Sequence, residues 1–198
     1  MYKAIGYKVT SGPAVEPVTL TEAKAQCRVI DTSEDTLITN LIVAARQYAE
    51  NYLNFAVIDQ QITAKFADFP DSRGSIDLPM TQLLSVTSVS YVDSTGATQT
   101  VSSADYLADT FSNPGVIYLA AGKNWPTSVA DQGAVLTVVY QAGLATNAAG
   151  VPQAIKQAML LLIGHWFENR EAIVVGTTSA AVQMTTSALL DPYRLLGV

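Results

Sequence analysis

The chain has 198 residues, of which 49% are hydrophobic and 14% are charged, and its formal net charge is -6. Soluble domains ordinarily carry about 25% charged residues, so this chain is poor in charge, although it is long enough to bury a sizeable core. The apolar content excludes a disordered chain, and no window reaches the roughly 18 consecutive apolar residues of a membrane-spanning helix. The composition therefore predicts a folded protein whose apolar, Ser/Thr-rich surface is covered by another molecule.

The distribution of charge and cysteine excludes further classes of protein. The basic residues are scattered singly from Lys3 to Arg194, whereas high-affinity binding of nucleic acid needs clustered Lys and Arg. Cys27 is the single cysteine, so it cannot form an internal disulfide. The first 13 residues lack the apolar segment of a secretory signal, so we expect synthesis in a reducing cytosol.

The N-terminal part predicts an arm and two helices. Residues 1–18 contain Gly12, Pro13 and Pro17 and are expected to form an extended arm without regular structure. Thr19 and Glu22 form a capping-box pattern that predicts a short helix to about Val29. Residues 31–33 then offer an N-cap for a second helix, from about residue 33 to residue 54. This second helix is predicted by nine apolar residues at helical spacing: Leu37, Ile38, Leu41, Ile42, Ala45, Tyr48, Ala49, Tyr52 and Leu53. Arg46, Gln47 and Glu50 mark its expected polar flank.

Between Val57 and Gly143 the helical period disappears and the pattern favours short strands. Residues 85–93 are rich in strand-forming residues, but their apolar positions fall on both faces, which predicts a bulge near Val86. Hairpin or turn connections are expected at 94–96 and 113–115. Residues 134–141 are apolar on both faces and are expected to form a central, buried strand.

Helical character returns at Pro152, and a broad apolar stripe predicts a largely buried helix with a polar end at 165–171. Ala172–Leu190 follows with no charged residue. A short helix is expected at about Thr186–Leu190, ending near Pro192. The predicted fold class is α+β: a helical bundle from residues 19–56 and 145–198, with an inserted antiparallel β module at 57–144 and an arm at 1–18.

Catalytic constellations are difficult to assemble from this sequence. His165 is the single histidine, and with Glu168 it forms an H-x-x-E pattern, whereas a metal site needs three or four ligands. No nucleotide-binding or nucleophile-elbow motif is present. Trp125 is expected to fill the β module, although an exposed Trp there could bind a glycan. We therefore predict no catalytic residue, cofactor or metal. A small carbohydrate-binding or hydrolytic module that uses Trp125, His165 and nearby acids remains an alternative, which would gain support if His165 and two carboxylates converged in one pocket.

The charge-free segment Ala172–Leu190 would be an aggregation hazard if it were left free in water. It either packs over its own domain, as in a plain monomeric protein, or docks on a neighbouring subunit or partner. We favour the hypothesis that it docks. Residues 81–150 hold only five charged side chains, and a ring of identical subunits would cover their uncovered strand edges.

Several segments of the sequence have counterparts in one known family. They are Pro17-Val18-Thr19-Leu20-Thr21-Glu22-Ala23-Lys24, the helix entering through Leu37-Ile38, Val86-Thr87-Ser88-Val89 with Tyr91-Val92-Asp93, Gly122-Lys123-Asn124-Trp125-Pro126 and, above all, His165-Trp166-Phe167-Glu168-Asn169-Arg170-Glu171-Ala172. Together these segments resemble the head–tail connector (adaptor) proteins of long-tailed double-stranded DNA phages and related gene-transfer particles. The resemblance covers about residues 17–196.

The resemblance implies a structural protein of the virion neck, without a cofactor. It implies a ring, usually of twelve subunits, that lies below the portal protein, continues the DNA channel toward the tail and lets DNA pass without specific binding. A stopper or tail-completion protein is the expected next component, and a stopper or tail-completion role for this chain is the close alternative. The implied subunit or portal contacts are His165, Glu168, Arg170, Glu171, Ile173, Val174, Val175, Val182 and Met184.

Overall fold

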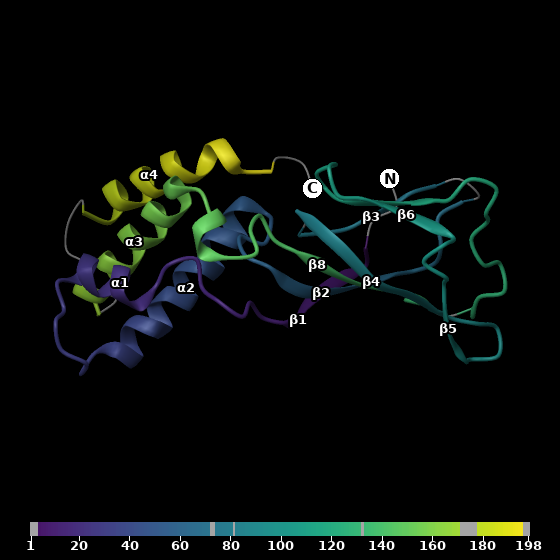
Figure 1. Ribbon diagram of the computed structural model, residues 1–198, viewed down its shortest axis with the longest axis horizontal. Coiled ribbons are helices and arrows are strands. Elements are labelled where there is room, and N and C mark those ends of the chain that lie inside the picture. Colours follow the sequence, from purple (N-terminus) through teal and green to yellow (C-terminus); the bar gives the residue numbers. More distant parts are fainter. Residues whose placement is uncertain (1–3, 72–73, 81, 132, 171–177, 196–198) are drawn as a thin grey trace. The chain divides into compact units, whose positions relative to one another are not determined.

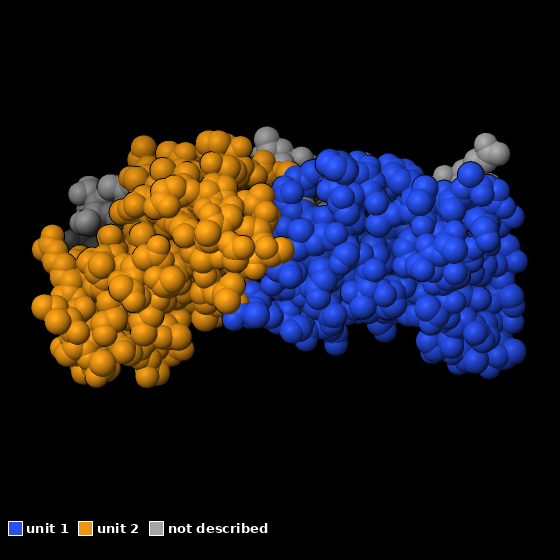
Figure 2. Space-filling model, in the orientation of Figure 1, with its two compact units in different colours: residues 1–14, 59–143, 198 blue, residues 15–58, 144–197 orange. Residues whose placement is uncertain are grey.

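The computed structural model describes residues 4–71, 74–80, 82–131, 133–170 and 178–195. The chain forms two compact units, a helical unit from residues 15–58 and 144–197 and a β unit from residues 1–14 and 59–143 (Figures 1 and 2). The α+β class expected from the sequence is confirmed by the four helices and the antiparallel sheets. None of the helices in the described ranges is long and apolar enough to cross a membrane.

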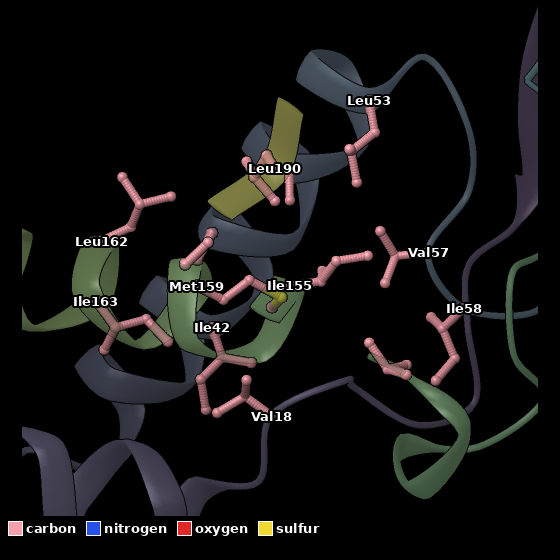
Figure 3. Packing of buried hydrophobic residues seen from close by; sticks show 14 of the residues in the cluster. Val18, Ile42, Leu53, Val57, Ile58, Ile155, Met159, Leu162, Ile163 and Leu190 are labelled. Carbon is pink, nitrogen blue, oxygen red and sulfur yellow. The ribbon is translucent and has the colours of Figure 1, made fainter. Parts of the chain in front are cut away.

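The helical unit contains α1 (Leu20–Cys27), α2 (Asp35–Leu53), α3 (Gln153–Glu168) and α4 (Thr178–Leu190), with short 3₁₀ turns at Ala148–Gly150 and Asp191–Tyr193. Its core is apolar and is built mainly from one face of α2 and one face of α3 (Figure 3). The fully enclosed side chains include Ile38, Leu53, Ile58, Ile155, Met159, Ile163 and Leu190. The apolar stripes that predicted the two long helices are therefore the faces that these helices bury against each other.

The start of α1 confirms the predicted capping box. The Thr19 hydroxyl accepts from the Glu22 amide at 3.2 Å, and the Glu22 carboxylate accepts from the Thr19 amide at 2.7 Å. The N-cap predicted at residues 31–33 is wrong, since Glu34 precedes α2 and provides no side-chain cap. The Asp31 carboxylate instead accepts from the Ser33 amide at 2.9 Å, so it closes its own turn rather than the helix end.

Helix α4 is longer than the short helix expected near Thr186–Leu190. It begins at Thr178, runs for 13 residues and lies along α3 (Figure 1). Its Ser/Thr-rich sequence has modest intrinsic helix propensity, but packing is available, because Leu190 is fully enclosed in the core of the helical unit. Tertiary packing overrides propensity here.

The β unit contains two antiparallel sheets. The larger sheet has the order β1-β2-β8-β4-β5, and the smaller has the order β3-β7-β6 (Figure 1). Strand β8 (Leu136–Ala142) lies between β2 (Gln60–Phe66) and β4 (Leu83–Val92), as expected of the apolar segment at 134–141. The remaining strands are β1 (Gly6–Ser11), β3 (Ile76–Asp77), β5 (Thr98–Thr100), β6 (Tyr106–Asp109) and β7 (Val116–Leu119).

Strand β1 corrects the prediction of an unstructured arm at residues 1–18. Residues 6–11 pair with β2 along its outer edge, with Tyr7 opposite Ala64 and Val9 opposite Ile62. The alternation of Tyr7 and Val9 with polar residues is a strand pattern, and it ends where Gly12 and Pro13 follow. All six residues of β1 stay exposed, because β1 is the edge of the sheet.

Two local predictions for the sheet are confirmed. The register of β4 against β8 shifts between Val86 and Ser88, which is the bulge that the mixed parity of the apolar residues indicated. Strands β4 and β5 are joined by a hairpin at residues 94–96, where Gly96 adopts a left-handed φ of 85°. Glycine takes this conformation without the cost that a Cβ would add.

Asp93 organises the β4–β5 hairpin. Its carboxylate accepts from the Thr95 hydroxyl at 2.5 Å, from the Gln99 side-chain amide at 2.8 Å and from the backbone amides of Thr95 and Ala97 at 2.9 and 3.1 Å. These donors, the Thr95 hydroxyl first, lower the pKa of Asp93 to about 2.

We predict that a carbon-13 NMR titration of the Asp93 carboxyl group has a midpoint at about pH 2. The folded-state pKa lies below the unfolded value of about 3.9, so the contribution of Asp93 to stability is present above that value and is lost as the pH falls toward 2. Replacement of Thr95 by valine removes the main donor and should raise the midpoint. A wild-type midpoint near 3.9 would contradict this account of the hairpin.

Candidate functional site

The contact residues expected from the sequence fall on α3 and α4 and between them. His165 and Glu168 lie in the last turn of α3, and Arg170 lies just beyond it. Met184 lies on α4, and Val182 belongs to the same helix. Glu171, Ile173, Val174 and Val175 lie outside the described residues. Of the expected site, the structure therefore describes the side chains of His165, Glu168 and Arg170 at the end of α3 and that of Met184 on α4.

The end of α3 is closed by a local hydrogen-bond arrangement around His165. The Asn169 amide nitrogen Nδ2 donates to the His165 carbonyl oxygen at 2.9 Å and lies 3.2 Å from the imidazole Nδ1. An amide NH₂ can only donate, so Nδ1 accepts and, in the neutral ring, the proton is carried by Nε2. The half-buried imidazole thus helps to end the helix and leaves Nε2 as a donor.

Arg170 connects the end of α3 with the start of α2. Its Nη2 lies 3.0 Å from Glu34 Oε1, and its guanidinium group lies 4.9 Å from the centre of the Phe167 ring. Both charged side chains remain partly exposed, at 52% and 33%. An exposed ion pair contributes about 0–1 kcal/mol to stability, so this pair orients Arg170 at the surface more than it holds the fold together.

Glu168 and Cys27 lie near each other where α1 packs against α3. The thiol of Cys27 is half-buried, and its pKa is raised by burial and, to a smaller degree, by the negative charge of Glu168. A raised pKa keeps the thiol protonated and poorly reactive at neutral pH. Cys27 is therefore a packing residue of this region and not a nucleophile.

Helix α4 has one side in the core and another exposed. Thr186 and Leu190 are buried, whereas Met184 is 74% exposed. An exposed Met is a flexible, polarisable side chain that is suited to adaptable contacts. Met184 is the residue of the expected site that the structure shows to be available on this helix.

A buried ionic network lies in the helical unit and corrects the sequence interpretation. Arg46 and Glu50 were expected on the polar flank of α2, but they are only 7% and 5% exposed. Arg46 Nε lies 2.8 Å from Glu16 Oε2, and Arg46 Nη1 lies 2.8 Å from Glu50 Oε2. Glu50 Oε1 also accepts from the Val57 amide at 3.1 Å.

This network ties the chain before α1 and the chain after α2 to the middle of α2. The spacing of Arg46 and Glu50 at i and i+4 is the signal from which the pair could have been predicted. The third partner, Glu16, lies 30 positions earlier in the sequence, and no local pattern connects it with Arg46. The network is structural, since each of its charged groups has its partner within the unit.

The alternative of a carbohydrate-binding or hydrolytic module centres on Trp125. This side chain is buried in the β unit, as predicted, and is only 5% exposed. It stacks on Phe69 with 5.2 Å between ring centres, and its Nε1 donates to the Gly74 carbonyl at 3.3 Å. A hollow of about 550 Å³ beside it is lined by Asp68 and Asp71 among others.

His165, the imidazole whose presence would support this alternative, is not among the residues that line this hollow. His165 is the single histidine, and it belongs to the helical unit, whereas the hollow belongs to the β unit. Across the residues that the structure describes, no group of three or more His, Cys, Asp or Glu side chains could hold a metal ion. The combination of one histidine and two carboxylates in one pocket, which would support the hydrolytic alternative, is not found in this hollow.

Chains of three solved structures share this fold. A chain in the "Neck of empty GTA particle computed with C6 symmetry" superposes with a TM-score of 0.76 at 18% identity, over 98% of this chain and 97% of that one. A chain in the "Virion of native gene transfer agent (GTA) particle" superposes with a TM-score of 0.77 at 17% identity, over 98% of this chain and 97% of that one. A chain in the "Neck of native GTA particle computed with C12 symmetry" superposes with a TM-score of 0.71 at 19% identity, over 96% of this chain and 97% of that one. Among curated proteins, no sequence matches this chain.

A family model gives the assignment that these distant likenesses cannot give alone. The model described as "HCP: Head completion protein" matches residues 17–194, so it extends over α1 to α4 and over all strands except β1. The match includes four of the residues expected from the sequence to form contacts: His165, Glu168, Arg170 and Met184. The chain belongs to the head completion protein family.

Proposed function

We propose that this protein is a non-enzymatic structural component of a virion neck, an adaptor that joins the DNA-filled head to the tail. The observation that carries the proposal is the match of the head completion family over residues 17–194. It is supported by the fold, which a chain from the neck of a gene transfer agent particle shares over 98% of this chain. A neck role also accounts for a composition that is poor in charge, because a subunit of an assembly covers much of its surface.

We propose further that twelve copies form a ring below the portal. The necks that contain similar chains were computed with C6 and C12 symmetry, and both are compatible with a closed ring of twelve. A ring uses heterologous contacts, in which two different patches of each subunit meet. Such contacts would also cover the open edges of the larger sheet, β1 and β5.

The end of α3 and the exposed side of α4 are the proposed subunit or portal contacts. His165 offers a donor at Nε2, Glu168 is exposed and Arg170 is held at the surface by Glu34. Met184 adds an apolar side chain. We assign the neighbouring Glu171, Ile173, Val174, Val175 and Val182 to the same contacts, because the resemblance to connector proteins implies contacts there. The last four are also apolar residues of the charge-free segment Ala172–Leu190.

DNA would pass through the ring without being held. Phosphate binding needs clustered cations, whereas this chain has a net charge of -6 with scattered basic residues. The channel is therefore expected to be lined by neutral or acidic side chains. A ring structure whose inner surface is predominantly Lys and Arg would contradict this part of the proposal.

A test of the neck role uses particles assembled without this chain. We expect electron microscopy to show DNA-filled heads and separate tails, and adding the purified protein should restore joined particles. Complete, joined particles in the absence of the chain would contradict a neck role. The stopper alternative is tested by binding: an adaptor binds purified portal directly, whereas a stopper binds only after another neck protein has been added.

A further inference from the structure

The connection between β6 and β7 presents an aromatic side chain to solvent. Phe111 is 98% exposed. The Asp109 carboxylate holds the connection in place, since it accepts from the Phe111 amide at 2.9 Å and from the Ser112 hydroxyl at 2.5 Å. These donors lower the pKa of Asp109, with the Ser112 hydroxyl as the main cause, so its charge persists at neutral pH. We call residues 109–115 the β6–β7 tip. This tip combines the exposed aromatic ring of Phe111 with the fixed negative charge of Asp109.

A mainly apolar groove that also carries positive charge lies on the outer edge of the larger sheet. It has a volume of about 370 Å³ and is lined by Ile5, Tyr7, Thr63, Ala134 and two lysines, Lys8 and Lys65. In the register of β1 and β2, Lys8 lies opposite Thr63 and Gly6 opposite Lys65, so the two lysines are diagonal neighbours. Within the described parts of the chain, no acidic side chain forms an ion pair with either lysine.

Gly6 leaves this groove open. It lines the groove directly opposite Lys65 in the register, and a Cβ built at Gly6 would meet no heavy atom within 4 Å. The groove thus exists where a strand residue has no side chain, at the unpaired edge of β1. A side chain from another molecule can occupy the same space.

We propose that the β6–β7 tip of one copy docks in this edge groove of the next copy in the ring, so that Phe111 enters the groove and Asp109 faces Lys8 and Lys65. This inference rests on the proposed ring. Charge complementarity selects the occupant: the groove carries two lysines in a chain with a net charge of -6, and the tip carries a fixed carboxylate. Apolar lysine stems and ammonium groups both favour an aromatic ring. Tip and groove are different patches of one chain, which is the heterologous arrangement that closes a ring.

The first test removes the aromatic ring. Phe111→Ala should weaken the association of subunits at least tenfold in sedimentation or mass photometry, while the melting temperature of the subunit stays unchanged. Ile30→Ala is the matched control, because Ile30 is 97% exposed and lies in the other unit. Equal association of wild type, Phe111→Ala and Ile30→Ala would overturn the proposal.

The second test fills the groove from within. Gly6→Phe places an aromatic side chain in the groove, where the surrounding atoms leave room for it, and should block the tip of the neighbour. Gly12→Phe is the control, because a Cβ at Gly12 also meets nothing within 4 Å but Gly12 does not line the groove. We expect ring assembly to be lost in Gly6→Phe and retained in Gly12→Phe. Assembly retained in both variants would overturn the proposal.

The third test is covalent and separates this inference from the ring itself. In a Cys27→Ala background, Phe111→Cys protein mixed with Tyr7→Cys protein should form a disulfide-linked dimer under mild oxidation, whereas a mixture with Ile30→Cys should not. Rings that form without this cross-link contradict the groove assignment alone. Absence of rings in the wild type, with and without portal, contradicts the proposed function.

If Lys65→Glu lowers retention of DNA but leaves ring assembly intact, the groove serves nucleic acid and the proposal is wrong.

Discussion

Replacement of Arg46 by alanine is expected to lower the free energy of unfolding by about 3–5 kcal/mol, because removing one partner of a buried ion pair leaves a charge without compensation. Arg46 lies between Glu16 and Glu50, at 2.8 Å from each carboxylate. Both Arg46 and Glu50 are buried. The substitution would leave the Glu50 carboxylate enclosed without the guanidinium group of Arg46, while the Val57 amide still donates to it.

The matched control for this prediction is Arg170→Ala. Arg170 also pairs with a glutamate, Glu34, at 3.0 Å, but both side chains are partly exposed, so the expected loss is about 1 kcal/mol or less. Chemical denaturation followed by circular dichroism measures both values. Similar losses for the two variants would show that burial does not set the energy of the Arg46 network.

Replacement of Leu190 by alanine is expected to cost about 2–5 kcal/mol of unfolding free energy, the range for truncating a buried leucine. Leu190 is fully enclosed in the core of the helical unit, although it ends a helix that the sequence predicted to be much shorter. Met184→Ala is the control on the same helix, because Met184 is 74% exposed and surface substitutions usually stay within about 0.5 kcal/mol.

The same pair of variants also separates folding from assembly. If α4 serves both its own core and a contact with another subunit, Leu190→Ala lowers the stability of the isolated protein, whereas Met184→Ala lowers only incorporation into particles. A stability loss in Leu190→Ala below about 0.5 kcal/mol would mean that α4 does not belong to the core of its own unit. Full incorporation of Met184→Ala would remove Met184 from the proposed contacts.

The position of α4 also changes how the charge-free segment is interpreted. Its lack of charge favours a segment that docks on another subunit or partner over one that packs on its own domain. In the described part, residues 178–190, the segment is helical and lies along α3, so part of it does pack on its own chain, as the plain monomer alternative requires. Assembly is therefore supported by the exposed Met184 on α4 and by membership of the head completion protein family, and not by the whole charge-free segment.

The helices could be predicted because their apolar residues recur with a period that only a helix satisfies. This holds for α2 and α3, whose stripes are the buried faces, and the capping box at Thr19 marked the start of α1 with its two hydrogen bonds. The central position of β8 followed from its apolar residues on both faces, and the bulge in β4 followed from a change of parity near Val86. Each of these signals is local in the sequence.

The features that sequence analysis missed depend on partners far apart in the chain. Strand β1 exists because β2, more than 50 residues later, offers its edge. Arg46 and Glu50 are buried because the chain at Glu16 covers them. Helix α4 is extended by packing on α3, against the modest helix propensity of its Ser/Thr-rich sequence.

The candidate site was only partly accessible from the sequence for the same reason. His165, Glu168 and Arg170 were singled out through resemblance, and the structure places them in and just beyond the last turn of one helix. The Asn169 contact with His165 and the Glu34 contact with Arg170 could not be derived from the residue pattern. The Phe111 tip and the groove at Gly6 were not predicted, because exposure and an empty space beside a glycine are properties of the folded unit.

The mass and rotational symmetry of the purified protein, measured alone and with portal, decide whether this chain is a subunit of a neck ring. Mass photometry and symmetry analysis of electron micrographs give both quantities. We expect a closed ring of twelve subunits, formed alone or on the portal. A monomer that persists at all concentrations and does not bind portal would contradict it.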